Sequence, residues 1–423
     1  MTSSLIILAL LWVLLLVGVP IAFSFTAVAM AMLWYIDIPL AAVPIQLISG
    51  VDNFILLSVP LFLLMSNILL KGGIGRDLFA AMQSWVGHWK GGLGIATILS
   101  CALFSAICGS SVATSATIGN VAIQEMTSRS YQRRFVFGLL AAGGTLGILI
   151  PPSIPLIIYS SITEDSIVDL FLAGLLPGLL LTALFVAYCF IHALFNQHTV
   201  PVAKASRQQR LRLSLCALPS MALALLIISG IYSGAFTPTE AAGVGTVAAL
   251  AIVLLMQRLS WSDFKLACMD SLRTTVTLFL IIVGAKLFSH AVALYDIPQV
   301  ITAAIVDTFS TPTGFLLVVG VIVLIMGLFL ESVSLLMLML MMPILLPALN
   351  AMGIDRIWFG ILFAILIEFA LITPPVGMNL FVIQAVGKGS LAEVSKGVIP
   401  FFFVMFLALV LVYLFPVIAV GII

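Results

Sequence analysis

Two pairs of adjacent prolines, each in the middle of a long apolar run, constrain this chain more than any other feature. They are Pro151-Pro152 and Pro374-Pro375. Proline removes a backbone donor and clashes with the preceding turn, so a helix ends before such a pair. At membrane depth the freed backbone groups must be buried in protein or face a polar cavity, because hydrocarbon cannot satisfy them. One break in each half of the chain is typical of a secondary transporter with its site at the membrane midplane.

The composition also indicates a membrane protein. Of the 423 residues, 63% are hydrophobic and 8% are charged, and the mean hydropathy is +1.31. Soluble domains carry roughly 25% charged residues. The first apolar run, from Leu5 to Trp34, is too long for a signal-peptide core, so we predict a retained span with a kink at Pro20. The five cysteines show no paired spacing, and the sequence contains no phosphate-binding loop and no metal-ligand cluster.

We predict an all-α polytopic membrane protein with nine spans and two re-entrant helical hairpins. The spans are expected at residues 5–34, 54–70, 135–162, 170–195, 215–231, from 237 onward, 276–294, 357–386 and 398–420. Residues 37–52 are interpreted as an outer connection, and 71–90 and 258–273 as interfacial stretches. The tetrad Thr237 to Glu240 matches a capping box with proline at the first helical position, which predicts a helix start.

The two hairpins are predicted from short apolar arms on either side of a small polar tip. The arms are 93–107 and 112–126 around the first tip, and 315–330 and 335–349 around the second. An arm of about 15 residues is near 23 Å long as a helix, which is short of the ~30 Å hydrocarbon core. Such arms favour a segment that enters and leaves the membrane on the same side.

The two halves of the chain are related by one shift in residue number. The shift that places Pro151 on Pro374 also places Ser111 on Ser334. It is called the proline offset below. Each half then has the order span, hairpin, broken span, span, and the two halves have opposite topology. We therefore predict inverted-topology repeats, which provide two nearly equivalent conformations, one open to each side. The predicted division is 1–52 (first span and outer connection, scaffold), 53–203 (first repeat, hairpin about 93–127), 204–275 (linker and central spans, scaffold) and 276–423 (second repeat, hairpin about 313–350).

Charge asymmetry predicts the orientation. Basic residues gather in 71–90, 129–134, 204–212, 258–273 and 388–396, which the predicted spans place on one side. The opposite side receives mainly acidic residues, with Arg356 as its one basic residue. The basic side is expected to be cytoplasmic, which puts the N-terminus in the cytoplasm and the C-terminus in the periplasm.

The chemistry of the tips and breaks predicts ion sites. Unwound carbonyls with Ser, Thr and Asn oxygens suit sodium, and helix N-termini attract anions. The predicted ligands of a first sodium site are Gly109, Ser110, Ser111, Gly147, Pro151 and Ser153. Those of a second are Ser332, Val333, Ser334, Thr373, Pro374 and Asn379. A carboxylate substrate is expected between the sites, near Thr114, Ser115 and Asn379. The alternative is that these side chains only satisfy the backbone or let helices pack closely.

Few ionisable residues fall at membrane depth, and such groups are functional candidates. They are Lys286, His290, Glu331 and Glu368. Glu331 adjoins the second tip, and Glu368 precedes the second break. A structural Lys–Glu pair or a buried, hydrogen-bonded acid is the alternative. Lys286 is a candidate partner of either acid, and His290 is expected near the outer boundary.

Five motifs in order resemble the large membrane subunit of TRAP (tripartite ATP-independent periplasmic) transporters. They are Gly-Ser-Ser-Val-Ala-Thr at 109–114, Ile-Pro-Pro-Ser-Ile-Pro at 150–155, Phe-Thr-Pro-Thr-Glu-Ala at 236–241, Gly-Leu-Phe-Leu-Glu at 327–331 and Ile-Thr-Pro-Pro-Val-Gly-Met-Asn at 372–379. The resemblance spans nearly the whole chain. It implies a sodium-driven elevator in which a domain carrying both hairpins and both broken helices slides against a scaffold, for which the first, fifth and sixth spans are candidates.

The resemblance also implies partners and a location. The partners are a small four-helix membrane subunit, expected as a separate chain, and a periplasmic substrate-binding protein. The implied substrates are organic acids such as C4-dicarboxylates and sugar acids, and the implied location is a bacterial or archaeal inner membrane.

Two other functions remain open. One is a stand-alone sodium symporter or sodium/proton antiporter of the same wider group, in which Glu331 and Glu368 serve protons. The other is an intramembrane enzyme, which four histidines without a nucleophile–base pattern disfavour.

Overall fold

The computed structural model describes residues 9–11, 13–15, 17–39, 42–195, 202–309, 311–327, 345–374 and 377–423, and every regular element in these ranges is a helix. Within them, 7 helices are long and apolar enough to cross a membrane: Phe54–Lys71, Arg133–Thr163, Ile167–Phe195, Arg207–Tyr232, Pro238–Leu255, Trp261–Leu294 and Leu391–Leu414. These correspond to the second to seventh and the ninth predicted spans. The first and eighth occur as shorter pieces.

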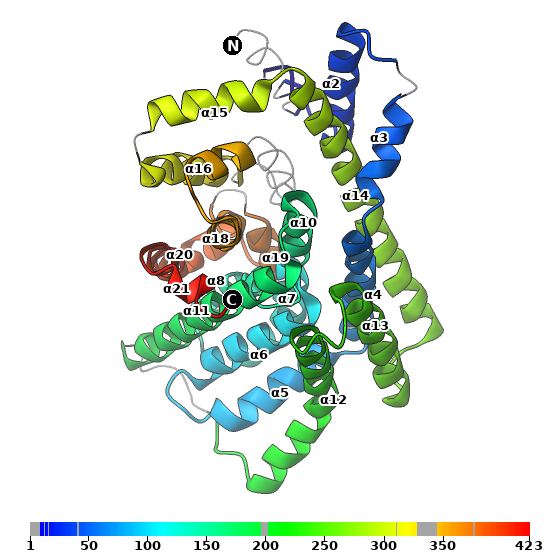
Figure 1. Ribbon diagram of the computed structural model, residues 1–423. Helices are drawn as coiled ribbons and strands as arrows, with labels where there is room; N and C mark the ends of the chain where they lie inside the picture. The colour runs from blue at the N-terminus through cyan, green and yellow to red at the C-terminus, as the bar shows by residue number, and fades with distance from the viewer. Residues whose placement is uncertain are drawn as a thin grey trace.

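A group of peripheral helices lies along one side of the molecule and is called the α14 column here (Figure 1). It consists of α2 (Ile21–Tyr35), α3 (Ala42–Val51), α4 (Ser58–Lys71), α13 (Pro238–Leu255) and the 34-residue α14 (Trp261–Leu294). Helix α14 packs against α2, α3 and α4, and α4 also packs against α13. Large apolar side chains of these helices are exposed, as at Leu255 and Val247, which suits contact with a bilayer.

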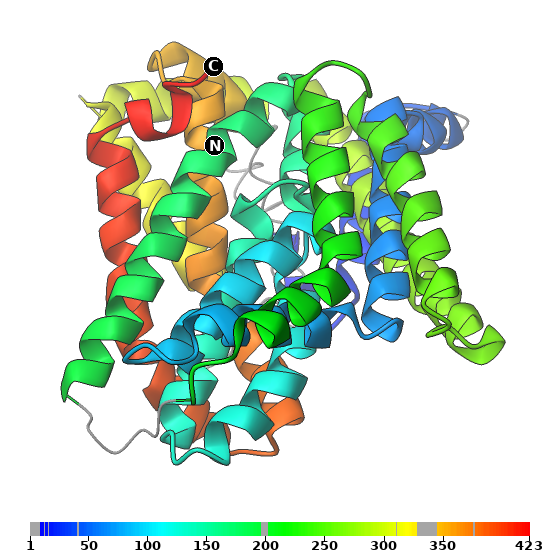
Figure 2. The ribbon, with the colours of Figure 1, turned by 90° about the horizontal axis from the view of Figure 1, so that it is seen from below.

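Most of the remaining helices form a bundle beside the column (Figures 1 and 2), and many of their side chains are buried. Its members are α5 (Ile74–Val86), α6 (Gly92–Cys108), α7 (Ser111–Thr127), α8 (Arg133–Gly144), α9 (Leu146–Leu149), α10 (Ile154–Thr163), α11 (Ile167–Phe195), α16 (Pro312–Gly327), α18 (Arg356–Leu371), α19 (Met378–Gly387), α20 (Leu391–Leu414) and α21 (Val417–Val420). Helix α12 (Arg207–Tyr232) packs against both α5 and α13, and so joins the bundle to the α14 column.

The first predicted hairpin is a pair of packed helices, α6 and α7, joined by a short turn at Gly109 and Ser110. Gly109 ends α6 with a left-handed backbone (φ 63°), and Ser110 is the N-cap of α7. Glycine suits this position because it has no Cβ to oppose a positive φ. Each helix has 17 residues, or roughly 26 Å, which is short of the ~30 Å hydrocarbon core.

Both paired prolines interrupt their helices as predicted. At the first pair the chain leaves α9 at Ile150, passes through a cis Pro151-Pro152 bond, and enters α10 after Ser153. At the second, α18 ends at Leu371 and α19 begins at Met378, with Gly377 as its N-cap.

Two predictions about the extent of helices are wrong, and a third segment has more regular structure than expected. The stretch 37–52, predicted as an outer connection, contains α3, since Pro44 falls in the first turn of that helix, where an N–H has no helical partner anyway. The stretch 258–273 is not a separate interfacial element. From 261 it forms one helix with the seventh span, since no glycine or proline occurs between 261 and 283. The first run is not one kinked span, because the chain turns at 17–18, with Gly18 at φ 87°, before α2 begins at Ile21.

Helix α15 (Ile297–Thr308) was not predicted, but its position follows the proline offset. That offset carries Ile74, the start of α5, onto Ile297, and it carries Arg133, the start of α8, onto Arg356, the start of α18. Helix α19 begins next to the position onto which the offset carries the start of α10. The elements of the two halves therefore recur at the spacing of the proline pairs, and the opposite topology of the halves stays a prediction. The second hairpin tip, within residues 328–344, lies outside the described residues.

Candidate transport site

The first hairpin tip rests directly on the first helix break. A Cβ at Gly109 would lie 2.3 Å from the carbonyl oxygen of Pro152, and a Cβ at Gly147 would lie 2.7 Å from the backbone of Ser110 and Ser111. Two glycines thus permit backbone-to-backbone contact between the tip and the break. The chain therefore brings together the tip and break residues predicted as the first sodium site, whose role as ligands stays a prediction.

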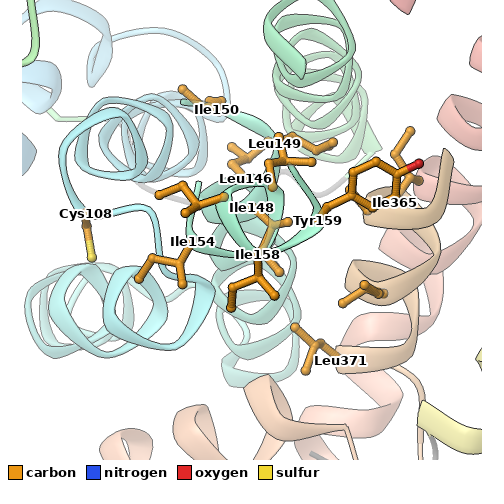
Figure 3. Packing of buried hydrophobic residues seen from close by; sticks show 14 of the residues in the cluster. Cys108, Leu146, Ile148, Leu149, Ile150, Ile154, Ile158, Tyr159, Ile365 and Leu371 are labelled. Atoms are coloured by element: carbon orange, nitrogen blue, oxygen red, sulfur yellow. The ribbon is translucent and has the colours of Figure 1, made fainter. Parts of the chain in front are cut away.

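The break itself lies between the hairpin and α18 (Figure 3). Cys108 marks the hairpin tip on one side, Leu146, Ile148 and Leu149 lie in the centre, and Ile365 and Leu371 of α18 lie on the other side. All of these side chains are buried. The polar groups of the tip and break are therefore enclosed by apolar packing, where electrostatic interactions are strong.

Two serines predicted as sodium ligands act as helix caps. The Ser110 side chain accepts from the amide of Ala113 at the start of α7 (3.4 Å), and the Ser153 side chain accepts from the amide of Leu156 at the start of α10 (3.5 Å). The caps place the N-termini of α7 and α10 beside each other, next to the ends of α6 and α9. Helix N-termini favour anions and helix C-termini favour cations, so the ends of these four helices suit both an anion and a cation.

Glu368 is the one described intramembrane acid that reaches this junction. It lies on α18, it is 0% exposed, and its Oε1 accepts a hydrogen bond from the hydroxyl of Ser111. The main-chain amide of Ile148, next to the break, lies close to the same carboxyl group. Its other oxygen, Oε2, is buried without a hydrogen-bond partner among the described residues. Glu368 thus joins the second half of the chain to the first tip.

The three residues predicted to bind the substrate are all buried on facing helices. Thr114 shares a hydrogen bond with Ser105 (3.4 Å), and Ser115 donates to the Leu140 carbonyl oxygen (3.4 Å). Asn379, at the start of α19, donates to the Ala141 carbonyl oxygen (3.3 Å), and its Oδ1 has no partner in the described part of the chain. Asn379 therefore lies against α8 of the first half, where it contributes one unused buried acceptor.

The second predicted sodium site is only partly described. Thr373 donates its hydroxyl to the Phe369 carbonyl oxygen (2.6 Å), and Pro374 is partly exposed. Four of the predicted residues lie outside the described part of the chain: Ser332, Val333, Ser334 and Glu331.

Lys286 lies on α14 against Gly50 of α3, whereas Glu368 bonds to Ser111 on α7. Lys286 therefore does not pair with Glu368, one of its two candidate partners, and its pairing with Glu331 stays untested.

A second contact at the tip, besides that of Glu368 with Ser111, was also absent from the predictions. Ser66 on α4 and Cys108 at the end of α6 share a buried hydrogen bond of 2.7 Å between their side chains. From the sequence, Cys108 had no role beyond the absence of paired cysteine spacing, and Ser66 had no assigned partner. The one signal for this contact in the sequence was the position of Cys108, which directly precedes the polar tip. This contact connects the tip with the α14 column.

A described chain that is wholly helical, with 7 apolar helices of spanning length, a short helical hairpin and two interrupted helices, is typical of a multi-pass membrane transporter. Residues 8–418 match the family model of the tripartite ATP-independent periplasmic transporter, DctM component. The chain therefore belongs to this family of large permease subunits, as the resemblance implied.

Several relatives align over nearly the whole chain. The C4-dicarboxylate TRAP transporter large permease protein DctM of Pseudomonas aeruginosa is 37% identical, over 89% of this chain and 88% of its own length. The sialic acid TRAP transporter large permease protein SiaM of Vibrio cholerae is 36% identical, over 95% and 94%. The ectoine TRAP transporter large permease protein TeaC of Halomonas elongata is 35% identical, over 88% and 87%. These names describe permease subunits and not enzymes.

Among solved structures, the chain is similar to the YdaH transporter of Alcanivorax borkumensis, which is described as having an unusual topology. The TM-score is 0.61, the sequence identity is 14%, and the match covers 88% of this chain and 87% of that one. At this identity the likeness concerns the fold alone.

Proposed function

We propose that this chain is the membrane permease of a sodium-coupled secondary transporter that takes up an organic acid. The observation that carries the proposal is the contact of the first hairpin tip with the first helix break, where Gly109 and Gly147 meet backbone directly. A buried Glu368 oxygen and a buried Asn379 oxygen have no partner among the described residues. Buried acceptors without donors are costly unless a ligand satisfies them, and a small cation fits that need.

The proposed substrate is a carboxylate. The relatives carry C4-dicarboxylate, sialic acid and ectoine in their names, and each of these compounds has a carboxylate group. In this chain the N-termini of α7 and α10 are adjacent, and helix N-termini bind anions. Thr114, Ser115 and Asn379 are the proposed contacts. All three are buried beside this junction.

The proposed transport cycle is an elevator. The tip, the broken helices and their neighbours move as one unit past the α14 column, and sodium ions enter with the substrate. We further propose a small four-helix membrane subunit and a periplasmic substrate-binding protein as partners, in an inner membrane with the N-terminus in the cytoplasm. The tripartite nature of the family supports both partners.

Reconstitution tests the proposal. Proteoliposomes that contain the chain with its small subunit are given a radiolabelled dicarboxylate or sialic acid, the cognate binding protein, and an inward sodium gradient. We expect accumulation that disappears when potassium replaces sodium or when the binding protein is omitted. Uptake that needs neither partner would instead support the stand-alone symporter, and uptake driven equally by potassium would contradict sodium coupling.

A further inference from the structure

Glu368 is the most unusual group in the bundle, because it is an acid with no exposed surface and no positive partner in the part of the chain that the structure describes. The four described ion pairs, Lys71–Asp270, Arg129–Glu125, Arg258–Asp77 and Arg356–Asp165, all involve partly exposed side chains elsewhere. Intramembrane acids face the bundle interior and pair with a charge, and they mark ion pathways. The partner of Glu368 is therefore to be sought in a ligand.

The position of Glu368 favours a cation at the first tip as that ligand. The Ser111 hydroxyl holds the carboxyl group at the tip, close to the Ile148 amide beside the break. Oε2 is free of hydrogen bonds among the described residues. An ionised carboxylate oxygen is an acceptor only, so a cation can satisfy it directly.

The contact between Glu368 and Ser111 joins the two halves of the chain at positions that the proline offset does not pair. Glu368 and Ser111 lie 257 residues apart, and the proline offset pairs Glu368 with Thr145 of the first half. Thr145 bonds back to the Ala142 carbonyl oxygen of its own helix. The first half thus has a neutral, satisfied hydroxyl where the second half has an acid, and the two halves are not equivalent at this position.

We propose that Glu368 is the charged ligand of the sodium site at the first hairpin tip, with Oε2 toward the ion and Oε1 held by Ser111. This inference rests on the proposed sodium coupling. The carboxylate neutralises the ion inside the bundle, so the loaded tip carries no net charge through the apolar interior. The same bond ties α18 of the second half to the tip of the first half, so ion binding acts on both halves together.

The test measures sodium binding to the purified protein by thermal unfolding in detergent, with choline replacing sodium at constant ionic strength. For Glu368→Gln, which keeps the size of the side chain but removes its charge, we expect the apparent sodium affinity to fall roughly 10- to 100-fold and the preference over potassium to decrease. Glu368→Asp should bind more weakly than wild type but keep that preference. Glu164→Gln is the matched control, because Glu164 is exposed, and should bind as wild type.

A second measurement needs no variant. Infrared difference spectra of the wild-type protein with and without sodium should show a change in carboxylate stretching, as a buried carboxylate gains an ion. A Glu368→Gln protein with wild-type affinity and selectivity would overturn the inference, and so would a wild-type spectrum without any carboxylate change. In either case sodium stabilisation of the wild type would leave the proposed function standing. Absence of sodium stabilisation in the wild type would overturn both.

Discussion

Gly109 and Gly353 adopt nearly the same left-handed backbone, with φ of 63° and 66°, but in different surroundings. A Cβ at Gly109 would meet the Pro152 carbonyl oxygen at 2.3 Å, whereas a Cβ at Gly353 would meet nothing within 4 Å. Both alanine variants carry the conformational cost of about 1–2 kcal/mol, but Gly109→Ala must also push the tip away from the break. We predict that Gly109→Ala abolishes sodium stabilisation in thermal unfolding.

Gly353→Ala is the control for that variant, since it shares the backbone strain without the clash. It should lower the unfolding temperature while sodium stabilisation and uptake persist. If Gly109→Ala retained sodium stabilisation equal to that of Gly353→Ala, the tip-and-break contact would not form the ion site.

Ser110 and Asn379 offer a second test at single residues. Ser110→Ala removes the cap of α7, which costs about 1 kcal/mol, and Asn379→Ala removes the hydrogen bond to the Ala141 carbonyl. We predict that each variant inserts normally but needs more sodium for half-maximal uptake. Ser206→Ala, which removes the cap of α12 at an exposed position, should not. Unchanged sodium activation in both site variants would argue against these positions as ligands.

The sequence predicted the contacts of a residue well when they follow from a local pattern, and poorly when they depend on the packing of distant helices. The approach of Gly109 to Ser111 toward 147–153 was predictable, because short arms, a small polar tip and a proline pair are local patterns. The bond from Glu368 to Ser111 was not, because it depends on the packing of helices that lie far apart in the chain. The roles of Ser110 and Ser153 as caps were weighed only as the alternative to ion binding.

At the scale of elements, α8 and α20 approach so closely that only glycine fits. A Cβ at Gly138 would lie 2.0 Å from the Gly397 carbonyl oxygen, and one at Gly397 would lie 2.0 Å from the Arg134 carbonyl oxygen. Small residues at such crossings let membrane helices pack backbone to backbone. The proline offset pairs Gly397 with Gly174, which itself packs against the Leu149 carbonyl oxygen.

We predict that Gly397→Ala forces α20 away from α8 and destabilises the folded protein by about 1–3 kcal/mol. Gly243→Ala on α13 is the control, because nothing lies within 4 Å of the added methyl group and alanine favours helix. The comparison is made by thermal unfolding in detergent. Equal unfolding temperatures for the two variants would contradict the close crossing.

Proline pairs, caps and apolar length predicted most helices, including the capping box that starts α13. What failed was the distinction between a connection and a short helix, as at α3 and α15. Helix α3 has a proline in its first turn, and α15 is only 12 residues long and carries one acidic residue. Neither pattern separates a short helix from a surface loop without the packing that surrounds it.

At the scale of the whole molecule, the bundle with the site and the α14 column are distinct groups of helices (Figure 1). An elevator requires that one group slides against the other while each keeps its packing. The hairpin tip contacts the column at Ser66 of α4 and Cys108, both of which are buried. This contact must change if the tip moves.

The most direct test of that movement uses the native Cys108. Its sulfur lies 2.7 Å from the Ser66 oxygen, so Ser66→Cys should form a disulfide with it under copper phenanthroline, whereas Ser66→Cys with Cys108→Ser should not. Sodium-driven uptake into proteoliposomes is then measured before oxidation, after oxidation and after reduction. The account predicts that the cross-linked protein loses uptake and regains it on reduction, while the control variant is unaffected. Full uptake by completely cross-linked protein would show that the tip does not move past α4, and would contradict the account.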